Sequence, residues 1–216
     1  MGTLWLYAIG INEVRGIFGA SQEDAEQLRA VAARRFGQPA GRHGLLAKLG
    51  PLFARPVDAP VLSTEAPTRE DCERLLAGQH VPPSRLTASW RLLATWLEAK
   101  AWSIHSAALD EHSLNAIEFE LGRTEVPSIY SPRALMSSDL GITMRPAPAM
   151  LSGYCTGARA KAAGRAWSEV EDQLEPTCRQ WTKGITAWLD GFDEWTAAAD
   201  AAGRARPDAV CLWWAD

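Results

Sequence analysis

The sequence has little cysteine, no excess of basic residues and no long apolar run, and each shortage excludes a class of protein. Its 216 residues include four cysteines, and no two of them form a Cys-x-x-Cys pair, so a zinc ribbon or a disulfide framework is not expected. Lys and Arg total 22 against 26 Asp and Glu, a net charge of −4, whereas nucleic-acid binders usually carry a basic excess. No apolar run approaches about 18 residues, the length that spans a bilayer. We therefore expect neither a nucleic-acid partner nor a membrane association.

Signals for export and for common cofactors are also absent. The amino terminus has no basic stretch, no small-residue cleavage site and no Ser or Thr at position 6, so neither secretion nor myristoylation is indicated. The P-loop, His-Glu-x-x-His and Gly-x-Ser-x-Gly motifs do not occur, and Gly157 and Gly164 lie in a helical context without a preceding strand. We expect a cytoplasmic protein that holds no metal and no cofactor, with its cysteines as buried thiols.

Tryptophan is the residue that the chain has in surplus. Ten of the 216 residues are Trp, and 47% of all residues are apolar, which is enough to build one well-buried core. Because Trp is large and amphipathic, such a number indicates an aromatic core, an adhesive interaction surface, or both. We favour the core.

Two short runs at the ends of the chain have the pattern of inner strands. Leu4–Ile9 and Ala209–Trp214 are apolar on both of their alternating faces, which is typical of a strand covered on each side. We expect the two runs to lie side by side in the middle of a sheet. Truncation of either end is then expected to destroy the fold.

Helical patterns fill most of the chain between these runs. From Pro82 to about Leu109, apolar residues recur in steps of four and three around most of the circumference, which predicts a helix buried from several sides. A second tryptophan-bearing helix is expected from Pro176 to Gly203. Further helices are expected over 21–36, 69–76 and 158–167, opened by Ser21, Thr68 and Thr156.

The other segments are less regular. The alternation over Asn115–Leu121 favours a one-sided strand, with a helix end as the alternative. The stretches 38–67 and 126–148 have no firm period, and short helices are expected near 45–49 and 133–136. Together these patterns predict a single α+β domain over residues 1–216, in which a small central sheet contains both terminal strands and several helices, two of them long and Trp-rich, pack against it.

Two groups of residues are candidates for catalysis. His105, Asp110, Glu111 and His112 would share one face if the long central helix continued past Leu109, and two imidazoles with a carboxylate suit acid–base chemistry or zinc. Cys155 precedes the Thr156 cap, and a helix amino terminus can lower the pKa of a thiol. The alternative is that the first group meets solvent at a helix end and that Cys155 is a small buried residue.

Charged residues in the middle of the chain are candidates for binding a partner. Glu118 and Glu120 would lie on one face of a strand, and the loop 123–133 combines charges, an aromatic residue and prolines. Acidic side chains here would steer a basic protein partner. The predicted partner-binding residues are Glu118, Glu120, Arg123, Glu125, Tyr130, Arg133 and Asp139.

Three stretches resemble a known family. They are Met1–Ile9 with Val14-Arg15-Gly16 after it, Gly153–Thr156 before a helix, and Asp208–Trp214 at the end. Together they resemble the YfbM-like family of uncharacterised bacterial proteins and its actinobacterial relatives of unknown function. The resemblance implies a compact α+β fold and no established reaction.

Three functions remain open at this level. The leading one is a non-catalytic binding protein, for example a toxin-neutralising protein of the immunity type or a regulatory partner. The second is a small cytosolic hydrolase or transferase with a pocket near His105, Asp110 and Cys155. The third is a self-associating module whose surplus tryptophans are buried in a homodimer.

Overall fold

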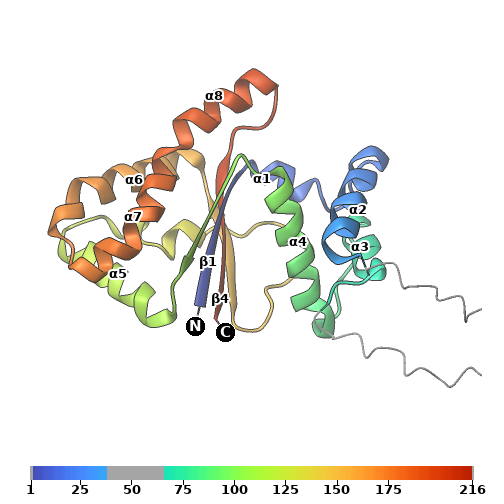
Figure 1. Cartoon of the computed structure of the whole chain (residues 1–216), viewed down its shortest axis with the longest axis horizontal. Coiled ribbons are helices and arrows are strands. Elements are labelled where there is room, and N and C mark those ends of the chain that lie inside the picture. Colours follow the sequence, from blue (N-terminus) through green and yellow to red (C-terminus); the bar gives the residue numbers. More distant parts are fainter. Residues whose placement is uncertain (1, 38–65, 216) are drawn as a thin grey trace, which may run out of the picture.

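The computed structural model describes residues 2–37 and 66–215. Its centre is an antiparallel sheet of four strands in the order β2-β1-β4-β3. The strands are β1 (Gly2–Ile9), β2 (Ser103–Ala108), β3 (Met150–Cys155) and β4 (Asp208–Ala215). The two terminal strands are the inner ones, paired along their whole length from Gly2↔Ala215 to Ile9↔Asp208, so the predicted neighbourhood of the two ends is confirmed. Figure 1 shows both chain ends at the same edge of the molecule.

Helices cover both faces of the sheet, which makes a three-layer α+β fold (Figure 1). One face packs against α4 and the elements around it: α1 (Ile11–Arg15), α2 (Gln22–Phe36), α3 (Arg69–Leu76), the 3₁₀ turn η3 (Pro83–Arg85) and α4 (Leu86–Lys100). We call this the α4 face. The opposite face packs against α5 (Glu111–Arg123), η4 (Ser128–Tyr130), η5 (Ala134–Met136), α6 (Gly157–Val170), η6 (Glu171–Gln173), α7 (Pro176–Asp190) and α8 (Phe192–Ala202). We call it the α7 face.

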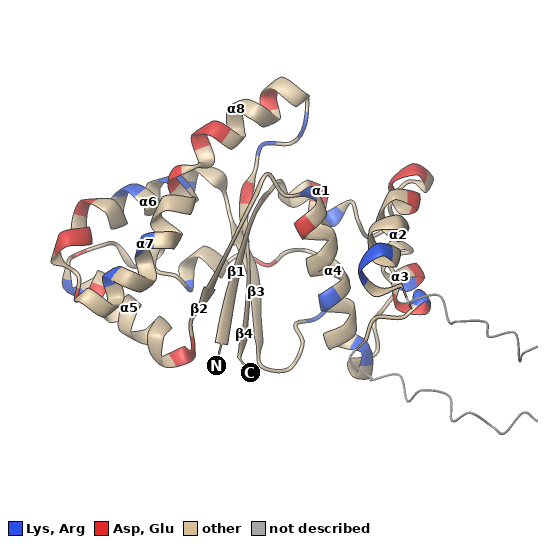
Figure 2. Ribbon diagram, viewed as in Figure 1, with Lys and Arg blue, Asp and Glu red and all other residues tan. Residues whose placement is uncertain are grey.

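The side-chain alternation of the inner strands explains why both faces need a cover. Tyr7 and Leu212 point to the α4 face, whereas Leu6 and Cys211 point to the α7 face, and all four are buried. Figure 2 shows that the strands carry almost no charge. The exception is Asp208, whose two carboxylate oxygens accept the backbone N–H groups of Ile11 and Gly157 at 3.0 and 3.2 Å. One carboxylate thus satisfies the first turns of α1 and α6.

Half of the ten tryptophans are buried in the core, so the predicted aromatic core is found, and the other half are half-buried. Trp90 and Trp96 of α4 are fully buried, and their indole N–H groups donate to Arg145 O and Leu28 O at 2.7 and 2.9 Å. On the α7 face, Trp167 donates to Tyr130 O at 2.9 Å and Trp213 to Leu109 O at 2.7 Å. These four indoles therefore bury their apolar rings while they satisfy their polar atoms, whereas the buried indole N–H of Trp188 has no partner among the described residues.

The long helix predicted up to Leu109 is wrong in its second half. Helix α4 ends at Lys100, Ala101 is extended, and the N–H of Trp102 donates to Ala8 O at 2.9 Å. Residues Ser103–Ala108 then form β2 against β1. The small apolar residues of this segment fit a helical period, but pairing with an inner strand outweighs that weak local preference.

The strand favoured over 115–121 is also wrong, and the helical alternative holds. Asp110 caps α5 by accepting the N–H of Ser113 at 2.8 Å. Leu114, Ile117 and Leu121 are buried at helical spacing, whereas Phe119 is 71% exposed. The apparent alternation arose because Phe119 is an apolar residue on the solvent side of the helix.

The carboxy-terminal helix is interrupted. Gly191 separates α7 from α8, and a Cβ at this position would lie 2.3 Å from Cζ2 of Trp195, so the ring packs directly on the backbone at the break. Trp188, Phe192 and Trp195 cluster there, with ring centroids 5.2–5.4 Å apart.

The shorter predictions mostly hold. Ser21, Thr68 and Thr156 cap α2, α3 and α6, and a 3₁₀ turn lies at Ala134–Met136. The short helix predicted near 45–49 falls outside the described residues. Among the described helices, none is both long and apolar enough to cross a membrane.

Candidate binding site

The predicted histidine cluster is divided between two elements. His105 lies on β2 opposite Leu6, and a Cβ on Gly184 of α7 would be 2.8 Å from its Cε1. Its imidazole therefore packs on the α7 backbone, and burial lowers the pKa of His105. His112 lies in the first turn of α5. Within the described part of the chain, no group of three or more His, Cys, Asp or Glu residues is arranged to hold a metal ion.

Asp110 and Cys155 have structural surroundings. The backbone N–H and the hydroxyl of Ser113 donate to Asp110, and these hydrogen bonds lower the pKa of its carboxyl. Cys155 ends β3 with 1% of its surface exposed, and burial raises the pKa of its thiol to about 12. The cap at Thr156 therefore does not produce a thiolate at neutral pH, because desolvation outweighs it.

The two glutamates do not form a carboxylate pair, because each is bound to its own arginine. Glu118 accepts Arg133 Nη1 at 2.5 Å and the Arg133 backbone N–H at 3.1 Å. Glu120 is buried, accepts Arg123 Nη2 at 2.7 Å and the Glu175 backbone N–H at 3.1 Å, and has its pKa lowered by these partners. The Glu118–Arg133 ion pair fastens α5 to the following loop, and the hydrogen bond from the Glu175 N–H to Glu120 connects α5 to the start of α7.

The other residues of the predicted partner loop have mixed surroundings. The carbonyl of Tyr130 accepts the Trp167 indole, Asp139 accepts the N–H of Gly141 at 2.6 Å, and Glu125 has a left-handed backbone with φ 64°. The role of this loop in binding stays a prediction.

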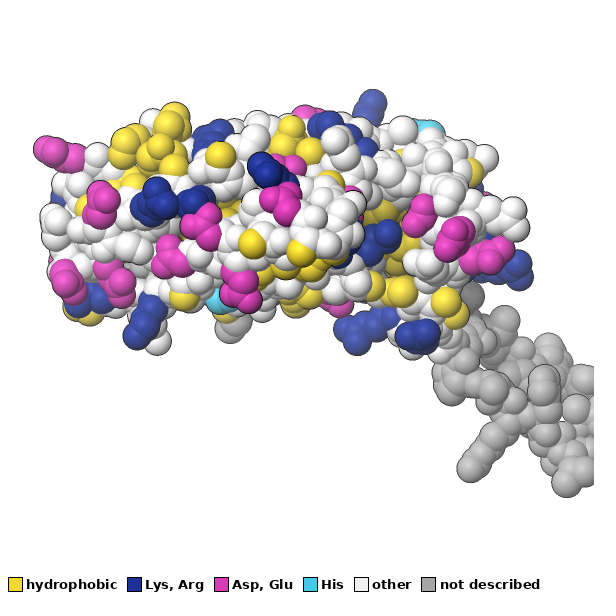
Figure 3. All heavy atoms as spheres, turned by 90° about the horizontal axis from the view of Figure 1, so that it is seen from above, with side chains coloured by type: hydrophobic (Ala, Val, Ile, Leu, Met, Phe, Trp, Pro, Cys, Tyr) yellow, Lys and Arg dark blue, Asp and Glu magenta, His cyan; other side chains and the backbone are white. Residues whose placement is uncertain are grey.

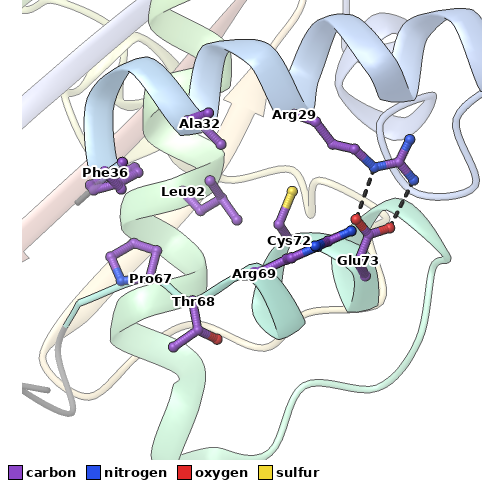
Figure 4. Close-up of a pocket in the computed structure, with 11 residues that line it drawn as sticks. Arg29, Ala32, Phe36, Pro67, Thr68, Arg69, Cys72, Glu73 and Leu92 are labelled. Atoms are coloured by element: carbon purple, nitrogen blue, oxygen red, sulfur yellow. Dashed lines mark hydrogen bonds and ion pairs between the residues drawn. The ribbon is translucent and has the colours of Figure 1, made fainter. Parts of the chain in front are cut away.

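A larger opening lies on the α4 side, between α2, α3 and α4. It is a groove of about 550 Å³ whose described lining is mostly apolar. Figure 4 shows Ala32, Phe36, Pro67 and Leu92 around it, with Cys72 on the side of α3. Burial raises the pKa of Cys72 to about 11, so the thiol is another apolar wall. We call this opening the α2–α3 groove.

Charged groups stand at one end of the α2–α3 groove. Arg29 of α2 donates twice to Glu73 of α3, at 2.9 and 2.7 Å (Figure 4). The hydrogen bonds from Arg29 lower the pKa of Glu73. Arg69 adds a second positive charge at the same end. The groove therefore combines an apolar floor with a rim that carries one more positive than negative charge.

A smaller hollow of about 240 Å³ lies beyond Phe36, between α4, the end of α2 and the sheet. Its described lining is Trp5, Tyr7, Arg35, Phe36, Arg91, Ala94, Thr95, Glu98 and Trp214. Trp5 and Trp214 are half-buried, so the described residues do not cover the terminal strands completely at this end. We call this opening the aromatic hollow.

The edge strand β2 is a third feature. Ser103–Ala108 includes no Lys, Arg, Asp, Glu or Pro, the residues that commonly protect an edge. No other strand pairs with its outer side in the described part of the chain. Ile104 is 40% exposed on the α4 face.

Elsewhere the exposed hydrophobic side chains are dispersed. Figure 3, seen from above, shows them in separate patches among charged groups. The α2–α3 groove and the aromatic hollow thus differ from these dispersed patches in shape as well as in composition. Sequence reasoning missed both, because their walls come from segments far apart in the chain. The half-buried Trp5 and Trp214 belong to the tryptophan surplus, the one signal that pointed to an adhesive surface.

The fold is a three-layer α+β arrangement, and the α2–α3 groove and the aromatic hollow both lie on the α4 side of the sheet. The chain belongs to DUF7691, a family described as a domain of unknown function, whose model matches residues 1–214. No curated protein and no solved structure matches the chain.

Proposed function

We propose that this protein is a non-catalytic binding protein that holds an apolar segment of a partner protein in the α2–α3 groove. The groove carries the proposal, since its volume of about 550 Å³ and apolar lining fall within the usual range of binding pockets, about 300–1,000 Å³. The surroundings of Asp110 and Cys155 support a role without chemistry, because one is a helix cap and the other a buried thiol.

The rim specifies the chemistry of the partner. An apolar side chain fills the floor beside Phe36 and Leu92, and an acidic group next to it meets Arg69. A toxin-neutralising or regulatory protein would work in this way, by covering a surface of its partner. The four buried free cysteines suit the reducing cytoplasm. The resemblance to YfbM-like proteins remains a hypothesis and adds no reaction.

The test uses two alanines of α2. Both are exposed on the same helix, but Ala33 lines the groove and Ala30 does not. The tagged full chain, Ala33→Arg and the control Ala30→Arg are used to capture partners from the native host, and stoichiometric partners are identified by mass spectrometry. The proposal predicts a partner that the wild type and Ala30→Arg retain and that Ala33→Arg loses by at least tenfold in affinity. Equal retention by all three proteins would contradict it.

The outer edge of β2, with which no described strand pairs, favours self-association as a second candidate. Two copies of β2 in antiparallel contact would join their sheets into one of eight strands, with small side chains at the junction. Light scattering at micromolar concentration tests this candidate. A wild-type dimer that Ser106→Lys converts to a monomer supports it, and a wild-type monomer removes it.

A further inference from the structure

The aromatic hollow has the walls of a site for a flat ligand. Trp5 and Trp214 lie on neighbouring strands and point to the α4 face, where Phe36 of α2 closes the hollow from the helix side. Trp5 pairs with Leu212 and Trp214 with Thr3, so the two indoles are diagonal neighbours on the sheet. Aromatic side chains that remain half-buried offer ring faces and edges that another ring can stack against.

A buried hydroxyl stands at the base of the hollow. Tyr7 has only 1% of its surface exposed, yet it lines the hollow. Throughout the described ranges, no residue forms a hydrogen bond with its hydroxyl. Burial and the nearby Glu98 carboxylate raise the pKa of Tyr7, so the group is a neutral phenol that can donate a proton. Polar groups that are largely buried normally have a partner, and Tyr7 is one of the residues that line the hollow.

The charges at the mouth select an anion. Arg35 is exposed, lines the hollow, and has no hydrogen bond or ion pair in the described part of the chain. Arg91 also lines it, and Glu98 is the single acidic group of the described lining. Arg91 has an interaction of its own, so Arg35 is the cation of the described lining that is offered to a ligand. A planar guanidinium suits a carboxylate because it can donate two parallel hydrogen bonds.

We infer that the aromatic hollow binds a small flat aromatic molecule that bears a carboxylate. The ring lies against Trp5 and Trp214, the carboxylate meets Arg35, and the Tyr7 hydroxyl donates to a polar atom of the ligand. The volume of about 240 Å³ suits one aromatic unit with a short substituent, smaller than a drug-sized ligand. This site is independent of the proposed protein partner, although Phe36 lines both openings.

Three related probes test the charge requirement on the full chain. Indole-3-carboxylate, indole and tryptamine share one ring and differ in charge, and their binding is measured by calorimetry and by ligand-detected NMR. We expect the carboxylate to bind at least tenfold more tightly than indole, and tryptamine to bind most weakly. Failure of the carboxylate to bind at millimolar concentration, or tighter binding of tryptamine, would overturn the inference.

Neighbouring arginines supply the matched control. Arg34 is exposed beside Arg35 but lines neither opening in the described residues. Arg35→Ala should weaken the binding of indole-3-carboxylate about tenfold and leave the affinity for indole unchanged. Arg34→Ala should change neither affinity. Equal losses in the two variants would show unspecific attraction and contradict the site.

Two more variants test whether Tyr7, at the base of the hollow, contributes to the affinity for the probe and whether a residue outside the hollow does not. Tyr7→Phe keeps the buried ring, so it should fold normally and weaken indole-3-carboxylate about fivefold to tenfold. Ala33→Arg should leave the probe affinity unchanged, because Ala33 lines only the α2–α3 groove. Unchanged affinity in a folded Tyr7→Phe protein would overturn the placement of the ligand, while the fate of the protein-partner proposal is decided separately by partner capture.

Discussion

The two faces of the sheet use the same residue types in different ways. On the α7 face, Trp167 and Trp213 are buried and their indole N–H groups meet carbonyls. On the α4 face, Trp90 and Trp96 are satisfied in the same way, but Trp5 and Trp214 are half-buried and line an opening. The α7 face also has half-buried tryptophans, Trp102, Trp181 and Trp195, whereas Trp5 and Trp214 of the α4 face line the aromatic hollow. The surplus of tryptophan therefore supplies the core and, in our proposal, the walls of a binding site.

The largest effect is expected from removing either inner strand, which both faces share. Deletion of residues 2–9 or of residues 208–215 removes one of the two inner strands, and with it the whole β1–β4 pairing, and exposes both halves of the core. We expect loss of cooperative thermal unfolding by circular dichroism. A truncated chain that still melts cooperatively would show that the two faces are stable without their common strands.

A single methyl group should disrupt the packing on the α7 face. A Cβ on Gly153 of β3 would lie 2.0 Å from the carbonyl oxygen of Met136, which belongs to η5. Gly153→Ala should lower the free energy of unfolding by about 3 kcal/mol or more, measured by urea denaturation. Gly122→Ala in α5 is the control, because its added Cβ meets nothing within 4 Å among the described residues, and it should stabilise the protein by up to about 1 kcal/mol.

Adjacent tryptophans of β4 compare the two faces directly. Trp213 points to the α7 face and donates to Leu109 O, whereas Trp214 points to the α4 face beside the aromatic hollow. Trp213→Phe should lower the free energy of unfolding by about 2–3 kcal/mol, because it removes the donor to a buried carbonyl and leaves a cavity. Trp214→Phe should cost less than about 1 kcal/mol. Similar costs in denaturant unfolding would remove the distinction between a packing and a binding tryptophan.

The smallest effect concerns α3, which borders the α2–α3 groove. Burial alone would raise the pKa of Asp71, but hydrogen bonds from Arg85 and Thr68 outweigh it and lower the pKa below its usual value. A lowered folded-state pKa means that the stabilisation is present above the unfolded-state pKa and is lost as the pH falls through the folded-state pKa.

Stability should therefore fall less steeply in Asp71→Asn than in the wild type as the pH is lowered below about 4. The substitution should also lower stability at pH 7. Glu70→Gln, on the exposed side of the same helix, should leave the acid profile unchanged. Thermal melts over a pH series measure both, and identical profiles for wild type and Asp71→Asn would contradict the assignment.

Sequence reasoning succeeded where local pattern and tertiary role agree. Leu4–Ile9 and Ala209–Trp214 are apolar on both faces because both faces are covered, so inner strands followed directly. It failed at 101–108, where alanines and Ile104 fit a helix and an edge strand equally well and pairing with β1 decides. It failed again at Phe119, an exposed apolar residue that imitated alternation.

The openings could not be read from the chain at all. The α2–α3 groove joins Arg29 and Phe36 to Cys72 and Leu92, and the aromatic hollow joins Trp5 to Glu98 and Trp214. No local period connects such positions, since only the packing of α2, α3 and α4 brings them together. Likewise Glu118 and Glu120 suggested a shared site, whereas the structure gives each its own arginine.

Hydrogen exchange on the complex with the captured partner tests the central claim most directly, because it reports both faces in one experiment. We predict slower exchange in α2 and α3 around the α2–α3 groove, with α6 and α7 unchanged. Protection confined to α5 and the loop 123–133, with none in α2 and α3, would contradict the assignment of partner binding to the α4 side.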